Sequence, residues 1–224
     1  SLKHIDWKLF ARSNKLFVKK FEEETNLRAH ILVDISSSMY YPQNDPVNKL
    51  KFSIYSAACL IYLFRKQRDG FGLTFFSDNI DFFSLAKNSK SHYNRLMFEL
   101  DKLLNVKNLG SRRVTNFPKI VTELIEKIHQ RSLIIIFSDM INFDESNSDA
   151  LFESLQHLRY KQNEVILFHV QDLLTEKVFS FPNKPHHFFD LETDSEIKLN
   201  PVNYKEIYQK SYNDFQKEIE TKCS

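Results

Sequence analysis

Short apolar runs alternate along the chain with longer stretches in which apolar residues recur every three or four positions. The runs predict strands at 28–33, 71–76, 80–83, 133–137 and 165–170. The longer stretches predict helices at 49–68, 91–104, 117–128, 149–162 and 204–219, and two last short segments, 187–190 and 197–199, predict a hairpin. Strands that alternate with helices of this length are typical of a doubly wound, mainly parallel α/β sheet with helices on both faces.

Two of the most apolar predicted strands end in aspartate. The first leads into Asp34, and the second leads through one serine into Asp139. Because the carboxyl ends of parallel strands lie at one edge of a sheet, we expect both carboxylates at the same rim. The spacing Asp34-x-Ser36-x-Ser38 can turn one carboxylate and two hydroxyls toward a common point. Oxygen ligands of this kind suit a hard divalent cation such as Mg²⁺.

The segment from Asp34 to Ser38 resembles the DxSxS element of the metal-ion-dependent adhesion site in von Willebrand factor A domains. In that family a threonine from a later loop and an aspartate at the end of the next central strand join this element, and Thr115 and Asp139 match in order and context. The resemblance implies a Rossmann-like von Willebrand A fold. It implies that Asp34, Ser36, Ser38, Thr115 and Asp139 hold Mg²⁺, or else Mn²⁺ or Ca²⁺. A Glu or Asp carboxylate of a protein partner would complete the coordination.

A second resemblance extends over nearly the whole chain. The IDW-x-x-x-AR stretch from Ile5 to Arg12 and the acidic Glu22–Glu24 are similar to the leader of bacterial proteins classed as domain of unknown function 58. In those proteins the leader runs straight into the strand with DxSxS. The resemblance implies a leader at 1–28 that packs on a von Willebrand A-like domain at 29–224. It also suggests an adaptor that works beside a MoxR-type AAA+ ATPase in the assembly or remodelling of other proteins.

The segment before Thr115 departs from the pattern of the family, which places glycines there. Here Arg112 and Arg113 stand close before the threonine. Pointing inward, the two arginines would compete with a cation. We expect them to point outward, where each could offer a partner carboxylate a bidentate contact.

Composition narrows the classes of function. Lys and Arg number 31 against 29 Asp and Glu, so the net charge of +2 provides no long-range attraction to nucleic acid or anionic lipid. Only 3 glycines are present, which argues against a glycine-rich phosphate loop. We predict no membrane span in this chain, because no apolar stretch approaches the roughly 18 residues that a span requires. Cys59 and Cys223 have no metal-ligand spacing, and we interpret both as free thiols in a reducing, cytoplasmic compartment.

The sequence gives no sign of an enzyme active site. Motifs that pair a nucleophile with a base are absent from the sequence. Adjacent His186 and His187 on a strand would face opposite sides and could not share one ion. The chain starts without Met, which suggests a piece of a longer protein. Two alternatives stay open: a metal-free scaffold that binds through its helices and the region of Trp7, and a metal-dependent hydrolase that uses Asp34.

Overall fold

The computed structural model describes residue 12 and residues 27–43, 45–105, 113–140, 148–192 and 195–223. Trp7, the acidic run Glu22–Glu24 and Arg112 lie outside these residues. The expectations for them, and for the leader as a packed unit, therefore stay predictions.

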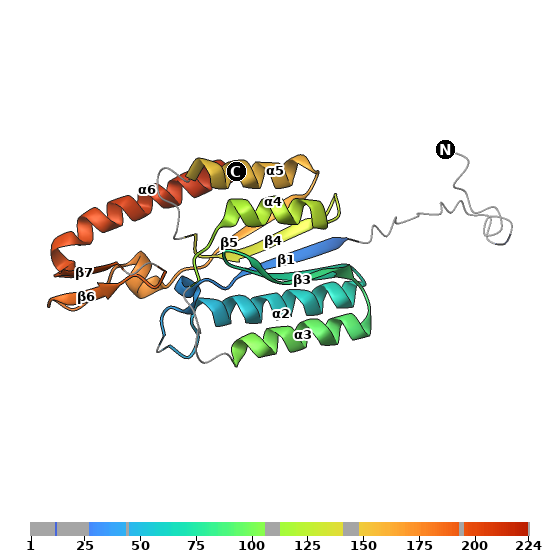
Figure 1. The fold of residues 1–224 in the computed structure, drawn as a ribbon, viewed down its shortest axis with the longest axis horizontal. Helices are drawn as coiled ribbons and strands as arrows, with labels where there is room; N and C mark the ends of the chain where they lie inside the picture. Colours follow the sequence, from blue (N-terminus) through green and yellow to red (C-terminus); the bar gives the residue numbers. More distant parts are fainter. Residues whose placement is uncertain are drawn as a thin grey trace.

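A five-stranded sheet forms the centre of the fold (Figure 1). Its strands are β1 (Arg28–Asp34), β2 (Gly70–Phe76), β3 (Ile80–Lys87), β4 (Leu133–Ser138) and β5 (Glu164–His169). Their order across the sheet is β3-β2-β1-β4-β5. The pairs β1–β2, β1–β4 and β4–β5 are parallel, and only the edge strand β3 runs antiparallel to its neighbour.

Helices cover both faces of the sheet, α2 and α3 on one and α4 and α5 on the other (Figure 1). Their bounds are α2 (Lys49–Gln67), α3 (Lys90–Leu104), α4 (Phe117–Lys127) and α5 (Ser148–Tyr160). The core consists of two hydrophobic clusters, one on each face of the sheet, and β1 contributes alternate residues to them. Ile31 and Val33 pack in the cluster with α2 and α3, whereas Leu32 packs in the cluster with α4 and α5. The doubly wound, mainly parallel fold predicted from the sequence is confirmed.

Local signals position the helices that lead away from the rim of the sheet. Before α2, the Asn48 side chain accepts a hydrogen bond from the backbone N–H of Lys51 at 2.9 Å. Asn116 does the same for Lys119 at the start of α4, at 3.3 Å. Such caps satisfy backbone donors that lack partners within the helix, so both helices begin close behind the rim.

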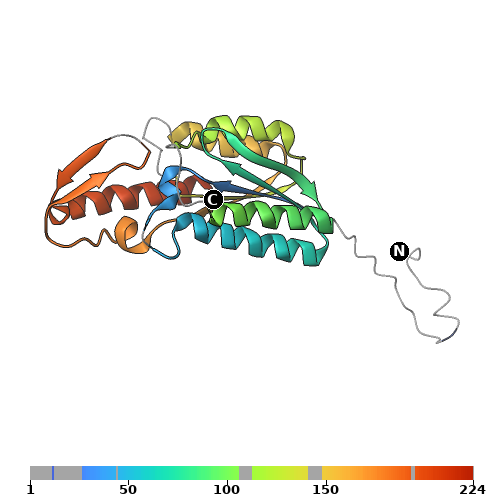
Figure 2. The ribbon, with the colours of Figure 1, turned by 60° about the horizontal axis from the view of Figure 1, so that its bottom comes forward.

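The chain after β5 forms a second layer of structure beyond the end of the sheet where α2 begins (Figure 1). It holds a π-helix, η3 (Leu173–Lys177), and an antiparallel hairpin of β6 (His186–Phe189) with β7 (Glu196–Leu199), followed by a 3-10 turn, η4 (Pro201–Tyr204). The last helix, α6 (Lys205–Cys223), runs from the hairpin back toward the sheet, as both views show (Figure 2). The hairpin and the last helix were predicted from the sequence, and the π-helix was not.

Candidate functional site

The strand order has its switch point between β1 and β4. These two neighbours lead to helices on opposite faces, α2 after β1 and α5 after β4. In doubly wound sheets ligands bind at such a switch point, outside the carboxyl ends of the strands. Asp34 ends β1 and Asp139 directly follows β4, so both lie at this point. The loop after β1 continues as a 3-10 helix, η2 (Ser37–Tyr40).

Asp34 is the centre of the hydrogen bonds at this rim. It is fully buried, and its Oδ1 accepts from the backbone N–H of Ser36 at 2.9 Å. The Thr115 hydroxyl donates to the same carboxylate, with Oγ1 at 3.2 Å and 3.1 Å from its two oxygens. Ser36 Oγ and Ser38 Oγ lie 3.0 Å apart. The structure thus brings together four of the five residues that the sequence predicted for one site.

Asp139, the fifth residue, directly follows Ser138, whose hydroxyl donates to Asp34, and is 3 % exposed. It is close enough for its charge to act on the Asp34 carboxyl. Its Oδ2 accepts a hydrogen bond from Lys49 Nζ at 2.7 Å, and the same ammonium donates to Glu176 Oε1 at 2.6 Å. All five predicted residues therefore meet at one rim, together with a buried lysine that the sequence analysis did not include. We call Asp34, Ser36, Ser38, Thr115 and Asp139 the rim site.

The segment that carries Thr115 is held against η2 by its backbone. Ser37 N donates to the Arg113 carbonyl at 3.0 Å, and Arg113 N donates to Ser37 Oγ at 2.9 Å. The Arg113 guanidinium instead reaches Asp81, with Nη1 3.4 Å from Oδ2, and a third of its side chain is exposed. It thus pairs with a surface carboxylate, in keeping with the outward direction expected for it.

Burial and charge shape the ionisation of the site. Burial, and after it the charge of Asp139, raises the pKa of Asp34 to about 7, although hydrogen bonds from Ser138 and Ser36 favour the ionised form. Burial would lower the pKa of Lys49, but the carboxylates of Asp139 and Glu176 outweigh it and raise that pKa. Asp139 shares the Lys49 ammonium with Glu176, and burial penalises a carboxylate whose charge is only partly balanced, so a further cation beside Asp34 and Asp139 would be favourable.

The donors at the rim fit a hard divalent cation. Two carboxylates and three hydroxyls are oxygen ligands of the kind that Mg²⁺, Mn²⁺ and Ca²⁺ take. Among the described residues no three His, Cys, Asp or Glu side chains group in a way that could hold a metal ion by themselves. The site would therefore depend on its neutral hydroxyls, which is unlike the nitrogen and sulfur sites that zinc prefers.

Four further side chains belong to the surroundings of the rim site and were missed from the sequence: Lys49, Ser138, Glu176 and Glu192. Ser138 Oγ donates to Asp34 Oδ2 at 2.6 Å, and its place in the strand-ending pair Ser138-Asp139 was a usable signal. Lys49 stands in the first turn of α2, where the helix dipole disfavours a cation, and that anomaly was a second signal. Glu176 and Glu192 lie in connecting segments and carry no local signal.

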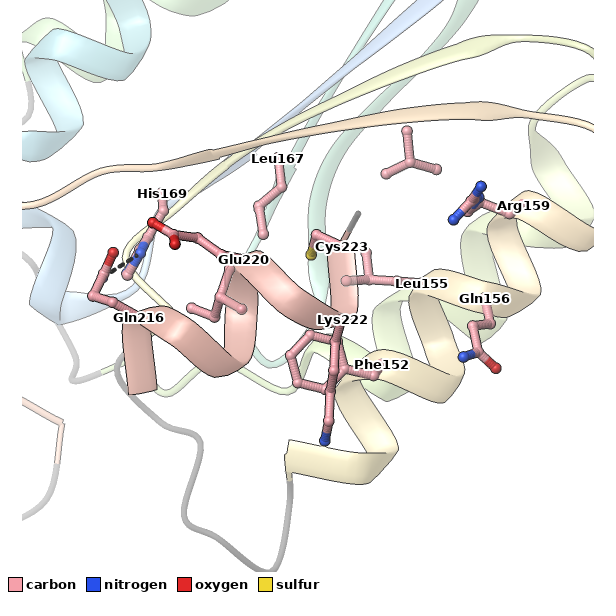
Figure 3. A pocket seen from close by; sticks show the side chains of 12 residues that line it. Phe152, Leu155, Gln156, Arg159, Leu167, His169, Gln216, Glu220, Lys222 and Cys223 are labelled. Atoms are coloured by element: carbon pink, nitrogen blue, oxygen red, sulfur yellow. Dashed lines mark hydrogen bonds between the residues drawn. The ribbon is translucent and has the colours of Figure 1, made fainter. Parts of the chain in front are cut away.

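A separate pocket of about 490 Å³ lies between α5, β5 and α6 (Figure 3). Its lining includes Phe152, Leu167, His169 and Cys223. The two ring nitrogens of His169 already have partners, the Asp139 carbonyl at 2.9 Å from Nε2 and Gln216 Nε2 at 2.9 Å from Nδ1. Burial raises the pKa of the Cys223 thiol. The pocket therefore holds no activated cysteine and histidine pair.

The chain is similar to several solved structures. Among solved structures, a conserved hypothetical protein BatB from Bacteroides thetaiotaomicron is 15 % identical, with a TM-score of 0.51 over 88 % of this chain and 98 % of that one. An aerotolerance-related membrane protein from Bacteroides fragilis is 13 % identical, with a TM-score of 0.48 over 87 % and 99 %. The VWA domain of SpRpn10 is 13 % identical, with a TM-score of 0.37 over 63 % and 88 %. At 15 % identity the likeness to BatB shows a similar fold and gives no information about function.

The mainly parallel sheet flanked by helices fits the Rossmann-like von Willebrand A fold expected from the sequence. No helix among the described residues has the length and apolar character needed to cross a bilayer. No curated protein sequence matches the chain. The family described as "Protein of unknown function DUF58" matches residues 1–218, nearly the full length, and the chain therefore belongs to the DUF58 family.

Proposed function

We propose that this domain is a protein-interaction module whose rim site holds one divalent cation and, through it, an acidic side chain of a partner. The observation that carries the proposal is the convergence of Thr115, Ser36 and Ser138 on the Asp34 carboxylate. These contacts join the loop after β1, the segment before α4 and the end of β4 at the switch point of the sheet. Function is a property of such a site, since the fold alone is compatible with many functions.

Each residue of the rim site would have its own part. The hydroxyls of Ser36, Ser38 and Thr115 would coordinate the cation, and Asp34 and Asp139 would bind it directly or through water. Because only two of these ligands are charged, the cation would remain electrophilic and attract a further carboxylate. The ion itself would add positive charge beside the buried Asp34 carboxylate.

The surroundings of Asp34 favour binding over catalysis. A nucleophile needs an open approach and a base within reach, whereas this carboxylate is fully buried and already accepts from Ser36, Thr115 and Ser138. A metal-dependent hydrolase is therefore the weaker candidate. It predicts turnover of phosphoester or peptide substrates that disappears in Asp34→Ala.

A metal-free interaction scaffold is the second candidate, and Lys49 favours it. Its ammonium already lies 2.7 Å from Asp139 and partly supplies the charge that a cation would bring. This candidate predicts that chelators leave partner binding unchanged. By family resemblance the partner under either candidate would be a MoxR-type AAA+ ATPase or a protein assembled with its help.

Thermal unfolding with Mg²⁺, Mn²⁺, Ca²⁺ or EDTA tests the proposal. A ligand that binds only the folded state stabilises it by about 2.7 kcal/mol at 100 times its dissociation constant, so at least one ion should raise the melting temperature. The double variant Asp34→Ala/Ser36→Ala should lose the response. Asp101→Ala removes an exposed carboxylate from α3 and should keep it. An equal response in wild type and double variant, or no response to any ion, would rule out a cation at the rim site.

A further inference from the structure

Lys49 connects the rim site to the layer of structure beyond the sheet. Its ammonium donates to Asp139 Oδ2 at 2.7 Å and to Glu176 Oε1 at 2.6 Å, and its side chain is 2 % exposed. The lysine stands in the first turn of α2, 90 positions from Asp139 and 127 from Glu176. One buried charge thus bonds two carboxylates from distant parts of the chain, one in the rim site and the other in η3.

Glu176 is held in place by hydrogen bonds that do not involve the lysine. Its Oε2 accepts from the backbone N–H of Asp172 at 2.7 Å, and its own carbonyl accepts from the Tyr208 hydroxyl of α6 at 2.8 Å. Asp172 in turn caps η3, since its Oδ1 accepts from Thr175 N at 2.8 Å. Glu176 therefore stays available to the ammonium as a fixed partner when the contact with Asp139 is broken.

We propose that Lys49 is an internal competitor of the cation at the rim site: its ammonium balances Asp139 in the metal-free protein, and it must move onto Glu176 alone before Asp139 can bind a divalent cation. This inference rests on the proposed function, because it needs a cation at the rim site. Lys49 would thereby set the affinity of the site without being a ligand of the ion. Glu176 would set it too, by drawing the ammonium away from Asp139.

The chemistry of the contact favours competition over joint binding. Two positive charges on one carboxylate repel each other, and the repulsion is stronger in the interior than in water because the effective dielectric constant is lower. Lysine also carries a compact charge on a flexible stem, so the ammonium can change partner without movement of α2. Because the bond to Glu176 remains, an ammonium that leaves Asp139 is not left buried and unpaired, which is the costly case.

Titration with MgCl2, followed by the NMR amide signals of the rim site, tests the inference, with sodium chloride at equal ionic strength as the salt control. Lys49→Met should bind Mg²⁺ about tenfold more tightly than wild type, because the competing charge is gone. Glu176→Gln should bind it about fivefold more weakly, because the ammonium then keeps Asp139 alone of its two carboxylate partners. Lys51→Met is the control: this lysine of the same turn donates to the Pro46 carbonyl, so its loss should change the affinity less than about twofold.

The double variant Lys49→Met/Glu176→Gln separates competition from a plain effect of charge on the ion. If Glu176 acts through the lysine, its substitution should not change the Mg²⁺ affinity once the lysine is gone. If the two charges act independently, their effects should add. Additive effects, or binding in Lys49→Met that is no tighter than in wild type, would overturn the inference.

Lys49→Gln provides a second variant in case the methionine variant does not fold. The glutamine keeps a side chain that can donate hydrogen bonds to the two carboxylates but removes the charge, so it too should bind Mg²⁺ about tenfold more tightly. Equal affinities of wild type and Lys49→Gln would reject the competition while a cation at the rim site still stands. No binding of Mg²⁺, Mn²⁺ or Ca²⁺ to wild type or to either lysine variant would reject the proposed function together with the competition.

Discussion

The Lys49 ammonium lies 2.7 Å from an Asp139 carboxylate oxygen, and the two side chains are 2 % and 3 % exposed. The same ammonium bonds Glu176 in η3 at 2.6 Å. One positive charge therefore joins the start of α2, the end of β4 and the π-helix. Removal of one partner from a buried ion pair is costly because the other partner remains buried and uncompensated.

Lys49→Met should lower the free energy of unfolding by about 3–5 kcal/mol, the range for breaking a buried pair. Urea denaturation of the variant and wild type measures the loss. Lys66→Met, at an exposed position of α2, should cost about 1 kcal/mol or less. If the rim site binds a divalent cation, Mg²⁺ should restore part of the loss in Lys49→Met, since the ion brings charge to Asp139. A cost as small as that of Lys66→Met would mean that the pair contributes little.

Ser138→Ala tests whether Ser138 only supports Asp34 or also coordinates a cation at the rim site. The Ser138 hydroxyl is buried and donates to Asp34 at 2.6 Å, so its loss should cost about 1.5–3 kcal/mol, the range for hydrogen bonds to charged groups. Because Ser138 is not among the proposed ligands, the stabilisation by Mg²⁺ should persist in this variant while Asp34→Ala/Ser36→Ala loses it. Ser91→Ala at an exposed position of α3 controls for the loss of a serine. Loss of the Mg²⁺ response in Ser138→Ala would add Ser138 to the ligands.

His30 should make stability fall in mild acid. It lies on β1 with 2 % exposure, Nε2 is 2.8 Å from Thr74 Oγ1, and burial lowers its pKa from 6.5 to about 3. The unfolded chain therefore takes up this proton first as the pH falls. The contribution of neutral His30 to stability is complete above pH 6.5 and is lost progressively between about 6.5 and 3, by up to about 1.4 kcal/mol per pH unit.

The measurement is the slope of the free energy of unfolding between about pH 6 and pH 4.5 in wild type and in His30→Gln. The variant should have the shallower slope, whereas His129→Gln, at an exposed position, should match wild type. Equal slopes in wild type and His30→Gln would show that His30 does not set the acid response.

Two glycines of β2 should respond in opposite ways to alanine. A Cβ at Gly72 would lie 2.6 Å from His30 Nδ1 and 2.7 Å from the backbone carbonyl oxygen of Ser84, so Gly72→Ala should cost about 1–3 kcal/mol, the range for overpacking. At Gly70 the nearest atoms to such a Cβ lie 3.7 Å away, and Gly70→Ala should be neutral or stabilising by up to about 1 kcal/mol. Thermal melts compare the two. A smaller loss at Gly72 than at Gly70 would contradict the packing of β2 against His30.

Most of the fold could be predicted because its signals are local. The run Leu133–Phe137 is apolar throughout and forms a strand that is buried on both faces, as such runs indicate. The adjacent pair His186 and His187 also behaves as strand geometry predicted. His187 Nε2 pairs with Glu196 at 2.9 Å, whereas His186 lies beside the Pro182 carbonyl. Cys59 and Cys223 are both free thiols, in agreement with the interpretation of the sequence.

Only those residues of the rim site that follow a strand end could be derived from the sequence pattern. Asp34 and Asp139 follow apolar runs, so their shared edge could be derived from the sequence. Lys49, Glu176 and Glu192 reach the rim through tertiary packing of α2, η3 and the hairpin loop. Nothing in the neighbouring sequence distinguishes the last two from ordinary surface glutamates. The π-helix was missed for a related reason, because five residues are too few to show a period.

The contacts at Asp34 also determine when the rim can form during folding. Asp34 meets Thr115 across 81 positions of sequence and Ser138 across 104, and Lys49 meets Asp139 across 90. Such distant partners approach one another only after the central strands have assembled, since closing long loops is slow. An ion at the rim site could therefore not nucleate folding of the chain. Its kinetic signature would be slower unfolding at an unchanged rate of folding, a pattern typical of contacts made after the transition state.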